Sequence, residues 1–304
     1  MDKCKCDDGI LNSGIQACSS GFGRVKKLIF VPYYDSTGAK NSISNTDVLD
    51  KAFYEAKVNE SDASEKWYPT DEIFNIVDER GDDVVETIEG VDFNIESGKR
   101  VFTGEFVNDY SKSPAYTAFL KSLTCPLVGV YYVDEYGDII GQSNGDNLDP
   151  FLIQRGSVKV KYIPKSFGSV GRNQITYTLG SSNTDADIKF RVSEDDAELL
   201  DLNGLVSVEL SSFVSTTTTA VNGVALLGNS TNQSGIAFGA EAANFEAYNV
   251  TLAAPITIVS ATANAVTGGI DFVLTAGDVN TTDSITIKTN LSGFESNVIA
   301  LTLI

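Results

Sequence analysis

Val91-Asp92-Phe93-Asn94-Ile95-Glu96 alternates apolar side chains with acidic or amide side chains, residue by residue. Successive side chains of an extended strand point to opposite faces, so this alternation predicts a β-strand with one apolar and one polar face. Further along the chain, Phe102 and Phe106 oppose Thr103 and Glu105 in the same way. We therefore predict that residues 91–96 and the region around them are β-structured.

A glycine-containing segment separates these two alternating stretches. Ser97-Gly98-Lys99 is typical of a hairpin turn, because glycine readily adopts the backbone angles that tight turns require. From this we expect residues 72–107 to form strands that fold back on one another at residues 97–99.

An acidic stripe runs through the same region. It is interrupted only by Arg80 and consists of Asp78, Glu79, Asp82, Asp83, Glu86, Glu89, Asp92 and Glu96. Such a run usually forms a solvated face. The alternative is a surface that repels an anionic partner. Catalytic carboxylates are disfavoured, since no apolar pocket that would raise the pKa of one of them is evident.

Two short helices and further strands complete the first predicted domain. Thr46 or Asp47 can cap a helix whose apolar face comprises Val48, Leu49, Ala52, Phe53 and Ala56. Ser113-Pro114 can start a second helix, with Tyr116, Phe119, Leu120 and Leu123 as its apolar positions. The expected strands are 25–34, 127–133, 139–140, 157–163, 174–179 and 188–192. This part is predicted to be α+β, with mostly antiparallel strands.

The composition changes near residue 205. Beyond it Lys288 is the only basic residue, and Ser, Thr, Asn, Ala, Val and Gly dominate. We therefore expect a flexible N-terminal arm (1–24), an α+β domain (25–204) and a second domain (205–304). The second has about seven short β segments at spacings of roughly 8–12 residues, which predicts an immunoglobulin-like β-sandwich. Its clearest strands are 245–252, 256–262, 270–274, 285–288 and 298–303. The chain as a whole is predicted to be mainly β.

Charge and composition exclude several function classes. The net charge is −19, which opposes tight binding to duplex DNA or to anionic membranes. The chain has no histidine, so histidine-based acid–base and nucleophilic catalysis are absent. We predict a protein that is not an enzyme and needs no cofactor. No apolar run is long enough for a signal peptide or membrane helix, so synthesis in a cytoplasm is expected.

Three cysteines near the N-terminus could offer thiolates to zinc. Cys4 and Cys6 have a C-x-C spacing, Cys18 follows later, and a fourth ligand is missing. Cys125, which precedes Pro126, lies far away in the sequence. These cysteines are weak candidates, and we predict no metal site.

A series of segments in residues 28–140 resembles structural proteins of tailed bacteriophages, and is most similar to a tail tube subunit. The segments are Phe30-Val31-Pro32, Lys66-Trp67-Tyr68-Pro69, Asp78-Glu79-Arg80, Arg100-Val101-Phe102-Thr103-Gly104-Glu105, Ser113-Pro114-Ala115-Tyr116, Leu120-Lys121-Ser122-Leu123 and Gly129-Val130-Tyr131-Tyr132-Val133-Asp134-Glu135-Tyr136-Gly137. They cover about a third of the chain. The cysteine-bearing N-terminal arm is a departure that the resemblance does not explain.

The resemblance implies a self-assembling virion protein. Tail tube subunits are α+β sandwiches that join their sheets into hexameric rings, and the rings stack into a negatively lined conduit for DNA. The resemblance also implies that the immunoglobulin-like domain lies on the outside of the tube. The partners would be further copies of the chain, other tail or head-completion proteins, and passing DNA without tight binding. The protein would be made in the host bacterial cytoplasm and end in the virion, without contact with a membrane.

Some of the acidic residues Glu86, Glu89, Asp92 and Glu96 are expected to face the lumen. Glu86 and Glu89 lie on opposite faces of a regular strand, so at least one of these two should point elsewhere unless a bulge intervenes. Strand alternation puts Asp92, Asn94 and Glu96 on one face, away from the apolar residues between them. Other interpretations remain open: a head decoration or head-to-tail connector, a cell-surface or adhesive binding module, and, more distantly, an enzyme that attacks polysaccharide through paired carboxylates.

Overall fold

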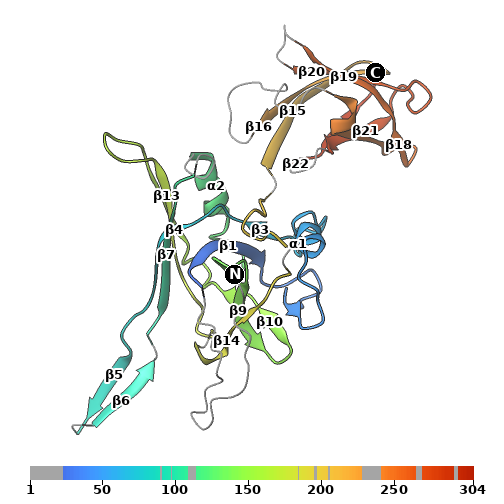
Figure 1. Ribbon diagram of the computed structural model, residues 1–304. Coiled ribbons are helices and arrows are strands. Elements are labelled where there is room, and N and C mark those ends of the chain that lie inside the picture. Colours follow the sequence, from blue (N-terminus) through green and yellow to red (C-terminus); the bar gives the residue numbers. More distant parts are fainter. Residues whose placement is uncertain are drawn as a thin grey trace. The chain divides into compact units, whose positions relative to one another are not determined.

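The computed structural model describes residues 23–89, 91–96, 98–108, 114–183, 185–194, 197–204, 206–227, 241–264, 269–290 and 294–304 (Figure 1). The chain divides into two compact units, Met1–Leu202 and Asn203–Ile304, and each unit is considered by itself. The described residues form many strands and two α-helices. The fold is therefore mainly β, as the alternation of apolar and polar residues predicts.

An eight-stranded sheet forms the centre of the first unit. Its main order is β2 (Ile43–Ser44), β10 (Asn147–Asp149), β9 (Ile139–Asn144), β8 (Val128–Asp134), β1 (Val25–Pro32) and β3 (Tyr68–Pro69). Two more strands join this sheet: β11 (Phe151–Leu152) pairs with β8, and β14 (Ile188–Arg191) pairs with β9. All of these pairings are antiparallel.

The middle strands of this sheet are covered on both faces. All seven residues of β8 are buried, as are the five residues Lys27–Val31 of β1. Their near-continuous apolar runs suit such a position, because a strand covered on both sides does not need alternation. One face packs against the second sheet of the unit, and the other packs against α1, Trp67 and the Ala197–Leu199 segment.

The second sheet of this unit has four antiparallel strands. Its order is β12 (Lys159–Ile163), β13 (Arg172–Thr178), β7 (Arg100–Phe106) and β4 (Phe74–Arg80). Phe102 of β7 and Tyr177 of β13 are fully buried, and their rings stack with centroids 4.9 Å apart. The alternation at Phe102 and Phe106 thus identifies the core face of β7.

The first helix differs from its prediction, whereas the second agrees. α1 (Lys51–Val58) begins after Asp50, whose carboxylate accepts a hydrogen bond from the Phe53 amide at 2.8 Å. The predicted caps, Thr46 and Asp47, are therefore wrong. The predicted apolar face is also wrong in part: Ala52, Ala56 and Val48 are exposed, and the helix buries Tyr54 and Val58. The reason is that Tyr54 packs against Trp67, which turns that side of the helix inward.

α2 (Pro114–Ser122) starts at the predicted proline. Tyr116, Leu120 and, just after the helix, Leu123 are buried against the core, as their spacing predicts. Phe119 is partly buried beside them.

A buried lysine ties the end of the first unit to its central sheet. Lys27 of β1 is 2% exposed, and its ammonium group donates hydrogen bonds to the carbonyl oxygens of Leu200 and Leu202. Burial lowers the pKa of Lys27 to about 8, against the opposing influence of Asp71, Asp201 and Glu72. The lysine therefore fixes the last residues before the second unit at an energetic cost that depends on pH.

This cost makes the stability of the first unit pH-dependent. The folded-state pKa lies below the unfolded value of 10.5, so between pH 8 and 10.5 the unfolded chain holds more protons and stability rises with pH. From pH 7.5 to 9.5 the native chain should gain up to about 2 kcal/mol relative to Lys27→Met. Urea denaturation followed by the fluorescence of Trp67 measures this difference. Lys26→Met keeps Lys27 and should retain the gain; equal pH profiles for the native chain and Lys27→Met would contradict the assignment.

Two sheets around one core form the second unit. The five-stranded sheet has the order β19 (Ile258–Asn264), β20 (Gly269–Leu274), β16 (Ala220–Leu227), β15 (Val206–Thr217) and β22 (Phe294–Ser296). The four-stranded sheet has the order β18 (Ala254–Ile256), β17 (Phe245–Asn249), β21 (Ser284–Thr289) and β23 (Ile299–Thr302). Both contribute to a single apolar cluster, so the unit is a β-sandwich. Its one described parallel pair joins β15 to β22. An immunoglobulin-like topology remains a prediction.

We expect the second unit to fold when expressed alone. Its core draws on its own residues only, with Phe272 between Phe245 and Phe213 at its centre. Residues 203–304 should unfold in one cooperative transition by circular dichroism. Residues 1–202 should keep the Trp67 fluorescence transition of the whole chain, because the single tryptophan lies in that unit. Loss of that transition on truncation would show that the two units depend on each other.

Candidate assembly surface

A projecting hairpin extends the four-stranded sheet of the first unit. Beyond β4 and β7 the chain continues as β5 (Val84–Ile88) and β6 (Val91–Glu96), an antiparallel pair that reaches away from the rest of the unit (Figure 1). The chain reverses between Ile88 and Val91, where Glu89 has a left-handed φ of 52°. The hairpin turn predicted at residues 97–99 is therefore wrong.

Gly98 instead marks a close approach of the two strands at the base of the hairpin. A Cβ atom at Gly98 would lie 1.7 Å from the carbonyl oxygen of Gly81, so only glycine fits. The Gly81 amide donates to the Lys99 carbonyl at 2.9 Å, and the Gly98 amide donates to the Asp83 carboxylate at 2.7 Å. These two hydrogen bonds connect the two chain segments that lie between the β4–β7 pair and the β5–β6 pair, where the regular strand pairing is interrupted.

Ion pairs hold the base of the hairpin. Arg100 donates two hydrogen bonds to Asp78, both at 2.7 Å, a bidentate arrangement that fixes orientation as well as distance. Asp185 accepts from Arg80 at 3.0 Å and from Arg100 at 3.3 Å. One member of the acidic stripe, Asp78, thus has a structural partner, and the base of the hairpin is well defined.

The register of the hairpin distributes its side chains over two faces. Ile88 pairs with Val91 and Glu86 pairs with Phe93, so these four side chains share one face, which we call the docking face. The opposite face carries Thr87, paired with Asp92, and Val85. We call this the acidic face, since Asp92 lies on it.

The four predicted lumen residues are therefore not equivalent. Asp92 lies on the acidic face, where its carboxylate accepts a hydrogen bond from the Thr87 hydroxyl at 2.6 Å. Glu86 lies on the other face beside Phe93, and Glu89 lies in the turn. Glu96 pairs with Val84 across a bulge; its side chain lies outside the described residues. The alternation of Asp92 with its apolar neighbours is as predicted.

The hairpin exposes apolar side chains along both of its strands. Six of its side chains are each between 50% and 59% exposed: Val84, Val85, Ile88, Val91, Phe93 and Ile95. A two-stranded hairpin is at best marginally stable in water on its own. A cluster of exposed apolar side chains of this kind marks a surface that binds another molecule. Sequence patterning predicted the apolar face but did not show that it lacks cover from the described part of the same chain.

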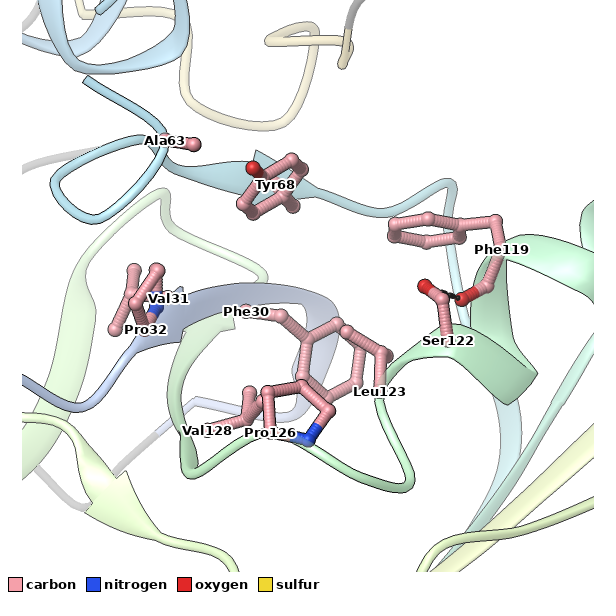
Figure 2. Close-up of a pocket in the computed structure, with 10 residues that line it drawn as sticks. All are labelled: Phe30, Val31, Pro32, Ala63, Tyr68, Phe119, Ser122, Leu123, Pro126 and Val128. Carbon is pink, nitrogen blue, oxygen red and sulfur yellow. Dashed lines mark hydrogen bonds between the residues drawn. The ribbon is translucent and has the colours of Figure 1, made fainter.

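An apolar pocket lies on the first unit beside α2 (Figure 2). Its volume is about 280 Å³, and it is lined by Phe30, Val31, Pro32, Ala63, Tyr68, Phe119, Ser122, Leu123, Pro126 and Val128. Tyr68 and Phe119 lie on one side of the opening, and Phe30, Leu123 and Pro126 on the other. The lining carries no carboxylate or amine, and the Ser122 hydroxyl donates to the Phe119 carbonyl at 2.6 Å. The pocket thus offers no acid–base pair.

The described residues contain no group of three or more Cys, Asp or Glu side chains that could hold a metal ion. Cys4, Cys6 and Cys18 lie outside the described residues, and Cys125 is free and exposed. In the described portion of the chain, neither helix has the length and apolar character of a membrane span.

Neither a comparison with protein-family models nor a search of curated proteins finds a match for this chain.

Proposed function

We propose that the chain is a structural protein of a tailed-phage virion, which assembles with copies of itself into stacked rings that form the tail tube. The observation that carries the proposal is the projecting hairpin with its six half-exposed apolar side chains. The resemblance of residues 28–140 to tail tube subunits supports the same role. This role requires no catalytic group and no cofactor.

In the assembled tube, the two faces of the hairpin have different partners. Ile88, Val91 and Phe93 of the docking face pack on a neighbouring copy and leave water. Asp92 on the acidic face lies toward the lumen. Carboxylates there repel the phosphates of passing DNA, so the DNA slides without being held. The second unit, which carries Lys288 as its only basic residue, is an external domain.

Weakening the docking face should weaken assembly. Phe93 is 50% exposed, and burying the rest of its ring in a contact contributes roughly 1–2 kcal/mol. Phe93→Ser should therefore raise the concentration needed for assembly about tenfold or more. Light scattering of a concentration series gives this threshold, and negative-stain images show whether the particles are rings or tubes.

Val85→Ser is the matched control, because Val85 is equally exposed but lies on the acidic face. It should leave the threshold nearly unchanged. Native protein that stays monomeric at high concentration, with virion components added, would refute the proposal and favour an adhesive binding module instead. Equal effects of the two substitutions would show that the faces are not distinct.

A further inference from the structure

Both edges of the four-stranded sheet are open within the described residues. β12 pairs only with β13, and β4 pairs only with β7. An open edge presents unpaired backbone N–H and C=O groups to which another strand can add.

The two edges carry opposite charge. Lys159 and Lys161 of β12 and the following Lys165 are exposed, and none of them forms an ion pair with a described carboxylate. At the other edge, Glu79 of β4 and Asp82 just beyond it are exposed, and Arg80 between them is paired with Asp185. Lysines on one edge alone would be explained as protection against aggregation. Opposite charges on the two edges also select the partner. They disfavour pairing of two β12 edges or of two β4 edges, and they favour pairing of a β12 edge with a β4 edge.

Strand direction allows the unlike edges to join. The three pairings in the order β12-β13-β7-β4 are all antiparallel, so β4 runs opposite to β12. A second copy in the same orientation therefore presents its β12 antiparallel to β4 of the first. Because the sheet has an even number of strands, each further copy can add through the same β4–β12 contact in the same orientation.

The register also puts the charges on one face of the sheet. Lys159 lies in one row with Thr176, Thr103 and Val77. Residues of a row share a face, and so do residues two apart in a strand, so Glu79 and Lys161 lie on the same face as Lys159. A contact between β4 and a second β12 then brings carboxylates and ammonium groups together on that face.

We propose that copies of this chain join head to tail, with β4 of one copy pairing antiparallel with β12 of the next through these charges. This inference rests on the proposed self-assembly and identifies the contact within a ring. The contact is heterologous, so it closes into a ring or continues as a helix, according to the rotation between copies. A five-residue strand alone makes a small contact, and docking of the hairpin adds to it.

Two charge-reversed variants test the pairing. In the basic-edge variant, Lys159→Glu and Lys161→Glu, two acidic edges meet; in the acidic-edge variant, Glu79→Lys and Asp82→Lys, two basic edges meet. Each variant alone should need at least tenfold more protein to assemble, as measured by light scattering. An equimolar mixture should assemble again, because each altered edge now faces its complement in the other variant. The double change Lys189→Glu and Lys288→Glu lies outside this sheet, makes the same change in net charge as the basic-edge variant, and should have little effect.

The Trp67 fluorescence transition shows in each case that the first unit is folded. Variants that assemble as the native chain does, or a mixture that fails to assemble, would overturn the head-to-tail contact while the proposed function stands. A basic-edge variant that loses only binding to a DNA oligonucleotide would assign the lysines to nucleic acid instead. A native chain that does not assemble would contradict both the function and the contact.

Discussion

Asp92→Lys, alone or with Glu96→Lys, is expected to slow DNA ejection and to make the assembled tube retain DNA as salt is lowered. Asp92 lies on the acidic face, and each copy in a ring would add one lysine at the same height. Each ammonium group that meets a phosphate steepens the dependence of log K on log salt by roughly 0.7–0.9. Because every copy in the ring carries the same lysine, the slope of log K against log salt should change by several units. We therefore expect the substitution of Asp92 to have the largest functional effect.

Glu86→Lys is the control for this substitution. It makes the same change in charge on the same hairpin, but on the docking face beside Phe93. It should disturb assembly more than DNA retention. Salt-dependent ejection from particles that carry Asp92→Lys measures the effect; retention that does not change with salt, or an assembled structure with Asp92 on the outer surface, would refute the lumen assignment.

Phe102→Ala is expected to produce the largest loss of stability. The ring of Phe102 is fully buried between the two sheets of the first unit, 4.9 Å from the ring of Tyr177 and 5.3 Å from that of Tyr132. Removing an aromatic side chain from such a site costs about 3–5 kcal/mol through lost transfer energy and the cavity left behind. Urea denaturation followed by Trp67 fluorescence should show this loss.

Phe272→Ala is the matched control, because Phe272 occupies the corresponding central position in the second unit. It should lower the stability of the second unit and leave the Trp67 transition in place. A loss below about 1 kcal/mol for Phe102→Ala would mean that the surroundings collapse into the cavity.

Local patterns predicted the strand of the exposed hairpin and the central strands of the first core. The alternation at residues 91–96 and the buried runs of β1 and β8 correspond to strands in the structure. The very short strands β2, β3, β10 and β11 were not predicted, because two or three residues carry no periodicity. Asp50 was missed as a helix cap because Thr46 and Asp47 are equally good capping residues a few positions earlier.

The candidate site was predicted only in part. The acidic residues and the alternation of Asp92 were evident, but the turn was placed at Gly98 because glycine marks both turns and close strand contacts. Because the chain reverses between Ile88 and Val91, Glu86 lies on the opposite face from Asp92. The open edges of the four-stranded sheet depend on the pairing of β7 with β13, about seventy residues apart, and no local pattern carries that information.

The buried central sheet also sets the order in which the first unit can form during synthesis. β1 pairs with β8 about a hundred residues later, and the face of both strands that α1 and Trp67 cover is completed only when Ala197 and Leu199 arrive. Such long-range pairing is slow to form. The ribosome needs roughly 5–20 s to add the residues of the second unit. That interval gives the first unit time to form while the second is still being made, and the hydrogen bonds from Lys27 to Leu200 and Leu202 can form only after those residues have been added.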